Sequence, residues 1–189
     1  MDEPVDDLDE LDANLRDIAF ANAHLGGTAL AIADDATRRG AHVRLTCVDH
    51  SEQMLALARR RCGDRTNLTF VRADGTALPF ERGAFDVALC TLALHHFDRE
   101  PAIALLRELR RVSRMTPVVC DLRRSAIAFA ATWLWSRTSR NRLTRHDAPL
   151  SVRRAYTPDE AIALAREAGW RAPTVRREPF FRMLLADAS

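Results

Sequence analysis

The chain has 189 residues, 47% of them hydrophobic, a size and composition that suit one domain with a substantial core. All 28 of its basic residues are arginine, and the formal net charge is only +2 because acidic residues crowd the first twelve positions. The absence of lysine excludes Schiff-base enzymes, P-loop nucleotidases of the usual form and dehydrogenases that rely on a Tyr/Lys pair. We predict an acidic tail over residues 1–12 and a single domain over residues 13–189.

The predicted elements alternate between helices and strands, judged by apolar spacing, caps and glycines. The helices are expected over residues 11–25, 28–39, 51–61, 100–112, 125–135 and 158–168. The strands are expected over residues 43–48, 68–72, 85–94 and 117–122, followed by a late hairpin formed by the strand around Val175 and the run PFFRMLLA. Strands that alternate with helices in this way predict an α/β fold with a mostly parallel, doubly wound sheet.

Two segments are less regular. The run FDVALCTLAL, residues 85–94, is almost continuously apolar, which is typical of a central strand buried on both faces. Residues 137–154 are rich in arginine without apolar periodicity and are predicted to be a loop or a lid. The preceding helix is expected to face the core, or alternatively to cover a lipophilic or aromatic acceptor with Trp133 and Trp135 as pocket walls.

The cysteines and the hydropathy pattern bear on the compartment. The four cysteines never form a C-x-x-C pair, which argues against a zinc knuckle or a disulfide framework. Acidic residues occupy the place of a basic leader region, and the most apolar run, residues 126–135, is well short of the ~20 residues that cross a bilayer. We therefore predict a reduced, cytoplasmic protein without a transmembrane segment or a metal site.

Ligands of open parallel sheets bind beyond the carboxyl ends of the strands, so residues that follow strands are candidates for a site. Asp49 follows the first predicted strand, where a carboxylate can accept hydrogen bonds from both hydroxyls of a ribose. Alternatively, Asp49 only helps to start the helix at Ser51. Asp74 and Gly75 follow the next strand, where Asp74 can accept from an exocyclic amine such as that of adenine; the alternative is an ordinary Asp-Gly turn.

Three segments, VDHSEQMLALARRR, VRADGTALPFERGAFDVALCTLALHHF and ALLRELRRVSR, resemble the later motifs of class I S-adenosylmethionine-dependent methyltransferases. The resemblance is to the branch of quinone-biosynthesis and related small-molecule methyltransferases, and it runs from about Thr28 to the end of the chain. It implies a Rossmann-like sheet with a C-terminal antiparallel hairpin, S-adenosylmethionine as cofactor and a small-molecule acceptor. The cofactor-binding residues that it implies are Asp49 and the adjacent His50 for the ribose, Ala73, Asp74 and Gly75 for the adenine, and Cys90, Thr91 and Leu92 for the methionine part.

The sequence departs from this family before Thr28. Family members begin with a strand that runs into an acidic residue and a G-x-G-x-G loop, whereas here HLGGT follows a helical pattern. We infer that the central first strand and its loop are missing, with Gly26 and Gly27 serving in part as the cofactor loop. Residues 43–48 would then pair directly with residues 85–91, or a groove would stay open between them.

His95 and His96 follow the strand on the acceptor side of such sites. One of them can act as a general base, since the unperturbed pKa of histidine lies close to neutrality. The alternative is that they cap the strand or hold the loop against Asp98. Many methyl transfers need little beyond alignment of the nucleophile, the methyl group and the leaving sulfur.

The sequence leaves two classes of function open. The first is a methyltransferase acting on a small, lipophilic or aromatic acceptor, and the second is a catalytically silent relative that binds a partner through exposed strand edges. A nucleic-acid partner would use the many arginines of residues 123–154, but the near-balanced total charge and the few aromatic residues beside them argue against it. The sequence does not fix the oligomeric state.

Overall fold

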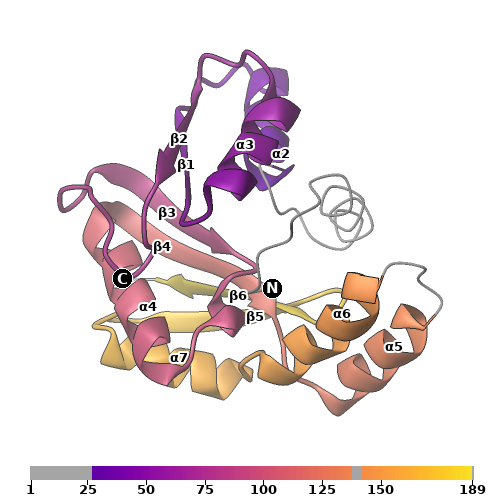
Figure 1. Cartoon of the computed structure of the whole chain (residues 1–189). Helices are drawn as coiled ribbons and strands as arrows, with labels where there is room; N and C mark the ends of the chain where they lie inside the picture. Colours follow the sequence, from indigo (N-terminus) through magenta and orange to yellow (C-terminus); the bar gives the residue numbers. More distant parts are fainter. Residues whose placement is uncertain (1–26, 138–141, 189) are drawn as a thin grey trace. The chain divides into compact units, whose positions relative to one another are not determined.

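The computed structural model describes residues 27–137 and 142–188, which fall into two compact units, residues 27–75 and residues 76–188 (Figure 1). The first unit comprises α2 (Gly27–Arg38), β1 (Leu45–Asp49), α3 (Glu52–Cys62) and β2 (Leu68–Arg72). The second comprises β3 (Phe85–Thr91), the 3-10 helix η1 (Leu94–His96), α4 (Arg99–Val112), β4 (Ser113–Leu122), α5 (Ala126–Ser136), α6 (Arg142–Arg154), α7 (Pro158–Glu167), β5 (Pro173–Glu178) and β6 (Arg182–Asp187).

The first unit is a parallel strand pair covered by two helices. β1 and β2 pair in parallel from Leu45 opposite Leu68 to Asp49 opposite Arg72. α3 begins after Ser51, whose side chain accepts a hydrogen bond from the Met54 backbone N–H at 3.4 Å, as expected of an N-cap. The predicted helix-strand-helix-strand order is confirmed, although β1 begins two residues later than expected.

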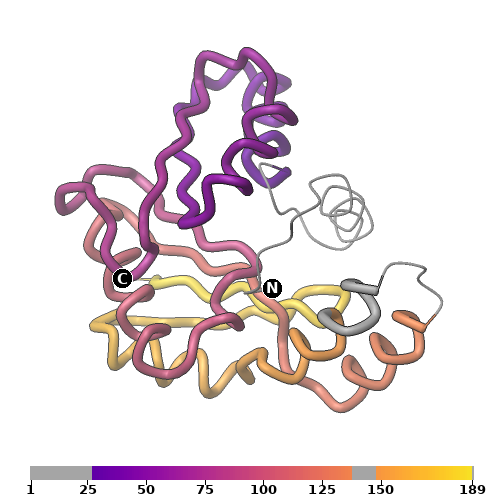
Figure 2. The backbone as a smooth tube through the Cα atoms, in the orientation of Figure 1, coloured from indigo at the N-terminus to yellow at the C-terminus, as the bar shows by residue number. Residues whose placement is uncertain are grey.

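The second unit contains a four-stranded sheet in the order β3-β4-β6-β5. β3 and β4 are parallel, whereas β6 is antiparallel to both β4 and β5. The chain trace shows β5 and β6 as the yellow hairpin that ends the described chain (Figure 2). The α/β class, with parallel strands and an antiparallel C-terminal hairpin, is therefore confirmed.

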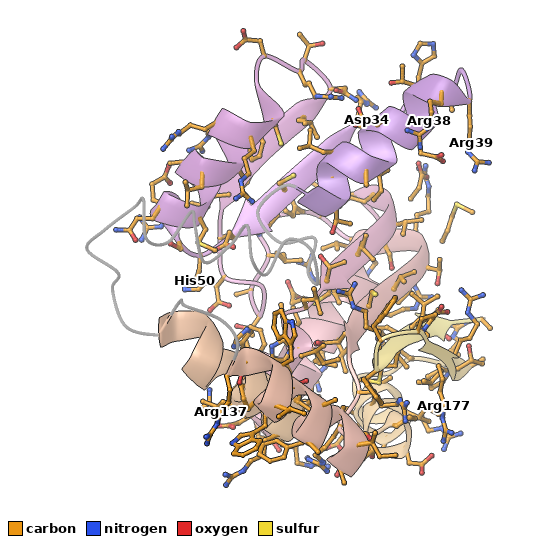
Figure 3. The ribbon with its side chains drawn as sticks, turned by 90° about the vertical axis from the view of Figure 1, so that its right-hand side faces the viewer. Asp34, Arg38, Arg39, His50, Arg137 and Arg177 are labelled. Carbon is orange, nitrogen blue, oxygen red and sulfur yellow. The ribbon has the colours of Figure 1, made fainter. Side chains whose placement is uncertain are left out.

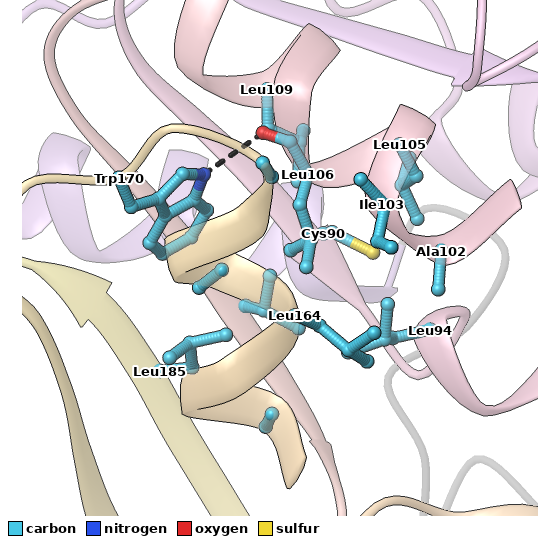
Figure 4. Packing of buried hydrophobic residues seen from close by; sticks show 14 of the residues in the cluster. Cys90, Leu94, Ala102, Ile103, Leu105, Leu106, Leu109, Leu164, Trp170 and Leu185 are labelled. Atoms are coloured by element: carbon cyan, nitrogen blue, oxygen red, sulfur yellow. Dashed lines mark hydrogen bonds between the residues drawn. The ribbon is translucent and has the colours of Figure 1, made fainter. Parts of the chain in front are cut away.

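Helix α4 supplies much of the core of the second unit. Its predicted apolar side is fully buried, and these residues are Ile103, Leu105, Leu106 and Leu109. Trp170, which follows α7, packs into the same cluster and donates a hydrogen bond from Nε1 to the Leu106 carbonyl oxygen at 2.9 Å (Figure 4). This bond satisfies the one polar atom of the buried indole and fixes the start of the hairpin against α4.

The ends of α7 follow the sequence signals closely. The Thr157 hydroxyl accepts from the Glu160 backbone N–H at 3.3 Å, and the Glu160 carboxylate accepts from the Thr157 backbone N–H at 2.8 Å. This reciprocal pair is the predicted capping box, with Pro158 in the first turn. Gly169 adopts a φ of +92° just after the helix, a conformation that glycine accommodates without steric strain.

The prediction that residues 85–94 form a strand buried on both faces is wrong in two respects. β3 ends at Thr91, because Leu92 adopts a left-handed φ of +53° and η1 follows. Ala88 and Cys90 are buried toward the core cluster, but Val87 and Leu89 on the opposite face are exposed. The apolar run therefore forms a strand, β3, with one face in the core and the other face exposed to solvent in the described structure.

The two predictions for residues 125–154 also need correction. The Arg-rich segment is not a loop, since Arg142–Arg154 is helical, with Pro149 inside it and Val152 buried. Helix α6 packs along α5, so tertiary contact compensates for the missing periodicity. α5 does not face the core, because only Ala128 and Ser136 of its residues are buried.

The proposed absence of a first strand concerns residues outside the described part of the chain. The predicted helix over residues 11–25, the acidic tail and Gly26 all lie there. Among the described residues, β1 pairs only with β2 and β3 only with β4, so direct pairing of residues 43–48 with residues 85–91 is not found. Gly27 is the first residue of α2.

Three further features concern the whole described part. Its cysteines carry no disulfide, and Cys62 and Cys90 are buried. In residues 27–137 and 142–188 there is no cluster of histidine, cysteine and acidic side chains that could hold a metal ion. None of the described helices combines the length and the apolar character needed to cross a membrane.

Candidate functional site

The carboxyl ends of β1 and β2 bring five predicted site residues close together within the first unit. The backbone N–H of Ala73, just after β2, donates to the Asp49 carbonyl oxygen at 3.0 Å. His50 follows Asp49 directly, and Asp74 and Gly75 follow Ala73 at the start of a turn. The Arg72 side chain adds a hydrogen bond to the His50 carbonyl oxygen at 3.1 Å. This edge is where ligands bind to open parallel sheets.

One of the two carboxylate oxygens of Asp49 is hydrogen-bonded to the backbone. Its Oδ1 accepts from the Ser51 backbone N–H at 2.8 Å and lies 3.6 Å from Nδ1 of His50. The alternative role at the start of α3 is therefore real. Among the described residues, no hydrogen bond to the second oxygen, Oδ2, is found, and the Asp49 side chain is 36% exposed. Because a carboxylate can accept several hydrogen bonds, the helix-start role leaves capacity for a ligand.

His50 itself projects into solvent. Its side chain is 88% exposed and is labelled in the view of the side chains (Figure 3). An exposed imidazole with one carboxylate at 3.6 Å is neither locked in orientation nor desolvated. His50 can therefore contribute to a ligand site through its backbone more readily than through its ring.

The carboxyl end of β3 has an unusual backbone in the second unit. Leu92 is buried and left-handed, and its N–H donates to the Cys120 carbonyl oxygen of β4 at 2.9 Å. A bulky residue with positive φ is strained, and such residues gather at functional sites. The turn directs the backbone of Thr91 and Leu92 out of the strand, at the edge where the sequence places ligand contacts.

The Cys90 side chain, one residue before Thr91, is buried in the core cluster of the second unit. Burial raises the pKa of its thiol to about 12, and the negative charge of Asp121 adds to the effect. Two backbone N–H groups, those of Ala93 and Leu94, oppose the shift. The thiol therefore stays protonated at neutral pH, so it is not a nucleophile.

The histidine that follows β3 is held by an acidic residue of β4. Nδ1 of His95 lies 2.6 Å from Oδ1 of Asp121, and the His95 backbone N–H donates to Oδ2 at 3.0 Å. The Leu122 backbone N–H also donates to Oδ1, at 2.6 Å. His95 is 4% and Asp121 1% exposed. Asp121 thus fixes both the backbone and the ring of His95.

The acidic partner of His95 is Asp121, a residue that was not predicted from the sequence. One alternative was that the histidine pair holds the loop against Asp98, but His95 binds Asp121 instead, and Asp98 is the N-cap residue of α4. Asp121 was not predicted, and its only signal in the sequence is a single acid in the otherwise apolar strand PVVCDL. The His96 ring lies against the His95 ring with centroids 4.2 Å apart and planes tilted by 37°. His96 is exposed whereas His95 is buried, so only His95 is fixed in orientation by burial.

A second polar cluster joins two of the quoted motifs. The Glu108 carboxylate of α4 accepts from the Leu78 backbone N–H at 2.8 Å and pairs with Arg111 at 2.7 Å. Arg111 also donates to the carbonyl oxygens of Leu78 and Phe80, at 2.9 and 2.6 Å. The LRELRR helix therefore clamps the loop after the ADGT turn, which gives both motifs a structural role.

This clamp predicts an acid-dependent contribution to stability. Hydrogen bonds from Arg111 lower the pKa of Glu108 below its ordinary value of 4.5, although partial burial opposes the shift. A carboxyl whose pKa is lower in the folded state stabilises the fold above its unfolded pKa, and this contribution is lost as the pH falls through the folded pKa. We expect E108Q to unfold at lower urea concentration than the wild type at pH 7, with the difference shrinking from about pH 5 to about pH 3.

The control is E100Q, on the same helix, because the Glu100 side chain is 81% exposed. It should leave the urea midpoint almost unchanged at every pH. A gap between wild type and E108Q that stays constant down to pH 3 would contradict the role of the ionised Glu108.

Comparison with known proteins gives relatives for part of the chain. A family described as a methyltransferase domain matches residues 24–116. A demethylmenaquinone methyltransferase of Clavibacter sepedonicus is 37% identical over 84 residues, 43% of this chain and 33% of that protein. The ubiquinone/menaquinone biosynthesis C-methyltransferase UbiE of Rickettsia bellii is 34% identical over 88 residues, 45% of this chain and 34% of that protein. The chain thus spans about a third of the length of these curated relatives.

Solved structures are similar over more of the chain but at low identity. A methyltransferase of Aquifex aeolicus, described as SAM-dependent, superposes with a TM-score of 0.61 and 16% identity, over 87% of this chain and 77% of that chain. The structure described as PigF with SAH has a TM-score of 0.63 and 14% identity, over 88% of this chain and 48% of that chain. At these identities the likeness is one of fold.

Proposed function

We propose that this chain is a class I S-adenosylmethionine-dependent methyltransferase, which binds S-adenosylmethionine and transfers its methyl group to a small-molecule acceptor. The proposal rests on the position of Asp49 at the carboxyl end of β1. After accepting a hydrogen bond from the Ser51 backbone N–H, its carboxylate can still accept hydrogen bonds from a ligand. The hydroxyls of a ribose diol donate hydrogen bonds, and the free acceptor capacity of the Asp49 carboxylate at this edge fits them. When bound, S-adenosylmethionine supplies an electrophilic methyl group on a sulfonium.

Each predicted site residue has a role in this proposal. Asp49 accepts from the ribose hydroxyls, and the backbone of His50 lies beside it. By the family resemblance, Ala73, Asp74 and Gly75 of the first unit are assigned to the adenine. In the second unit, the backbone of Thr91 and of Leu92, whose φ is +53°, is assigned to the methionine part. Cys90 contributes only its backbone, because its side chain is buried in the core cluster.

His95 is the residue that we propose to accept a proton from the acceptor where one is released. With Nδ1 bound to Asp121, Nε2 is the ring nitrogen left for proton exchange. The exposed His96, stacked on His95, is the second candidate. Alignment of the reacting groups supplies most of the rate in either case.

The acceptor that we propose is a lipophilic aromatic molecule. The names of the relatives refer to demethylmenaquinone and to ubiquinone and menaquinone biosynthesis, and this chain shares more than a third of its residues with one of them over the matched segment. Methyl transfer to such a ring would break the bond between the methyl group and the sulfonium sulfur and form a bond from the methyl group to a ring carbon. It would release S-adenosylhomocysteine, and the displaced ring proton would pass to a base such as His95.

A silent, partner-binding relative is the second candidate function. The observation in its favour is that, within the described residues, β1 and β3 each pair with one neighbouring strand only. Unpaired strand edges are templates for a strand from another chain. Such a protein would fold and bind its partner without binding the cofactor.

Calorimetric titration with S-adenosylmethionine separates the two functions. We expect saturable binding by the wild type and binding at least roughly tenfold weaker in D49A and D74A, since each loses a hydrogen bond to the ligand. D49N is the sharper variant, because its amide oxygen can still accept from Ser51 while the negative charge is lost. Weaker binding by D49N without loss of thermal stability would assign Asp49 to the ligand rather than to the start of α3.

The matched control is D35A. Asp35 lies on α2 in the same unit and pairs at the surface with Arg38 and Arg39, at 3.1 and 2.6 Å. Its loss should leave the affinity for S-adenosylmethionine unchanged. A folded wild type that does not bind S-adenosylmethionine would favour the silent relative.

A further inference from the structure

Helix α5 is packed with its small side toward the protein and its large apolar side toward solvent. Ala128 and Ser136 are its buried residues, and Thr132 between them is half-buried, so the packed side follows a four-residue spacing. Of the nine large hydrophobic residues that are exposed in the described part of the chain, five lie on this helix. They are Ile127, Phe129, Trp133, Leu134 and Trp135. Soluble proteins seldom gather so many on one helix without an apolar ligand for them.

The segment that contains α5 and α6 is rich in positive charge. Residues 123–154 contain eight arginines and one acidic residue, Asp147. Arg137, at the end of α5, lies over the Trp133 ring at 4.0 Å from its centroid (Figure 3). Arg153 and Arg154 at the end of α6 are exposed. A surface of exposed leucine, isoleucine and tryptophan bordered by arginine is complementary to apolar chains bordered by negative headgroups.

We propose that α5, with the arginines around it, docks on the surface of an anionic lipid bilayer. The helix has 11 residues, too few to cross a bilayer, so it lies in the plane of the interface with its large side chains among the upper acyl carbons. Tryptophan favours this depth, since its ring is apolar and its N–H is polar. Arginine stems extend along the apolar layer while the guanidinium groups reach the phosphates. Docking would place the protein beside acceptors dissolved in the membrane.

Vesicle binding by the full chain tests this proposal. We expect the protein to sediment with vesicles of phosphatidylcholine and phosphatidylglycerol, and to sediment much less with phosphatidylcholine alone or at high salt. The emission of Trp133 and Trp135 should shift to the blue and be quenched by bromine-labelled lipid, whereas the buried Trp170 gives a constant background. I127D/L134D should weaken the partition by roughly tenfold or more. These two side chains are 72% and 67% exposed, so the fold does not depend on them.

The control is F180D. Phe180 is 89% exposed between β5 and β6, and its φ of +57° is one that aspartate tolerates. F180D should bind vesicles like the wild type. Equal binding to uncharged vesicles, unaltered binding by I127D/L134D or an unshifted tryptophan emission would each overturn the proposal. The proposal would also be overturned if the protein did not bind vesicles but instead self-associated or bound duplex DNA, and if I127D/L134D abolished that association. The assay contains no S-adenosylmethionine, so its outcome does not depend on methyl transfer.

Discussion

D121A is expected to lower the free energy of unfolding by about 3 kcal/mol, because three donors lose their acceptor in a buried site. The donors are the backbone N–H groups of His95 and Leu122 and the ring of His95. Urea unfolding at pH 7, followed by circular dichroism, measures the change. D121N should fall between wild type and D121A, since the amide keeps one acceptor oxygen but turns an N–H₂ group toward a donor.

The control variant D86A shows how much of the loss in D121A is due to burial of the carboxylate. Asp86 lies on the neighbouring strand β3 and pairs with Arg114 at the surface, where both side chains are mostly exposed. An exposed pair of this kind contributes about 0–1 kcal/mol. Equal losses in D86A and D121A would show that Asp121 acts only as a surface charge does.

Replacing Trp170 with alanine is expected to cost about 4 kcal/mol, since a large buried side chain is removed beside α4. W170F keeps most of the apolar volume and loses only the hydrogen bond to the Leu106 carbonyl oxygen. We expect W170F to cost about 1 kcal/mol. Urea unfolding of the two variants therefore separates the packing contribution from the hydrogen bond.

The same substitution at an exposed position provides the control. W135A removes a half-exposed indole from α5 and should lower the free energy of unfolding by about 1 kcal/mol, well below the loss in W170A. If W135A were as destabilising as W170A, α5 would belong to the core, and the exposed surface described above would not exist in solution.

Features set by local chemistry could be predicted from the sequence. Ser51, Thr157 and Gly169 act through backbone groups within a few residues of themselves, so caps and turns are visible in the sequence. The position of Asp49 follows from the same local order of strand, acid and helix. The strand over residues 68–72 was predicted with the observed boundaries, because the apolar run and the Asp-Gly turn that follows it are also local signals.

Features set by distant partners could not be predicted. His95 and Asp121 are 26 positions apart, and nothing near either residue shows that they meet. The orientation of α5 was inferred wrongly because apolarity alone does not say which side of a helix finds a partner. α6 lacks apolar periodicity and is held by its packing on α5, a contact that exists only in the folded chain.

The antiparallel neighbour of β4 has a consequence for the order of events during translation. β4 is paired on one side by β3 and on the other by β6, which occupies Arg182–Asp187, sixty positions after β4 ends. While the ribosome is still extending the chain before Arg182, the edge of β4 that later pairs with β6, from Val118 to Leu122, has no partner. A nascent polypeptide in that state carries an unprotected β-edge, the kind of surface on which chaperones act to prevent aggregation.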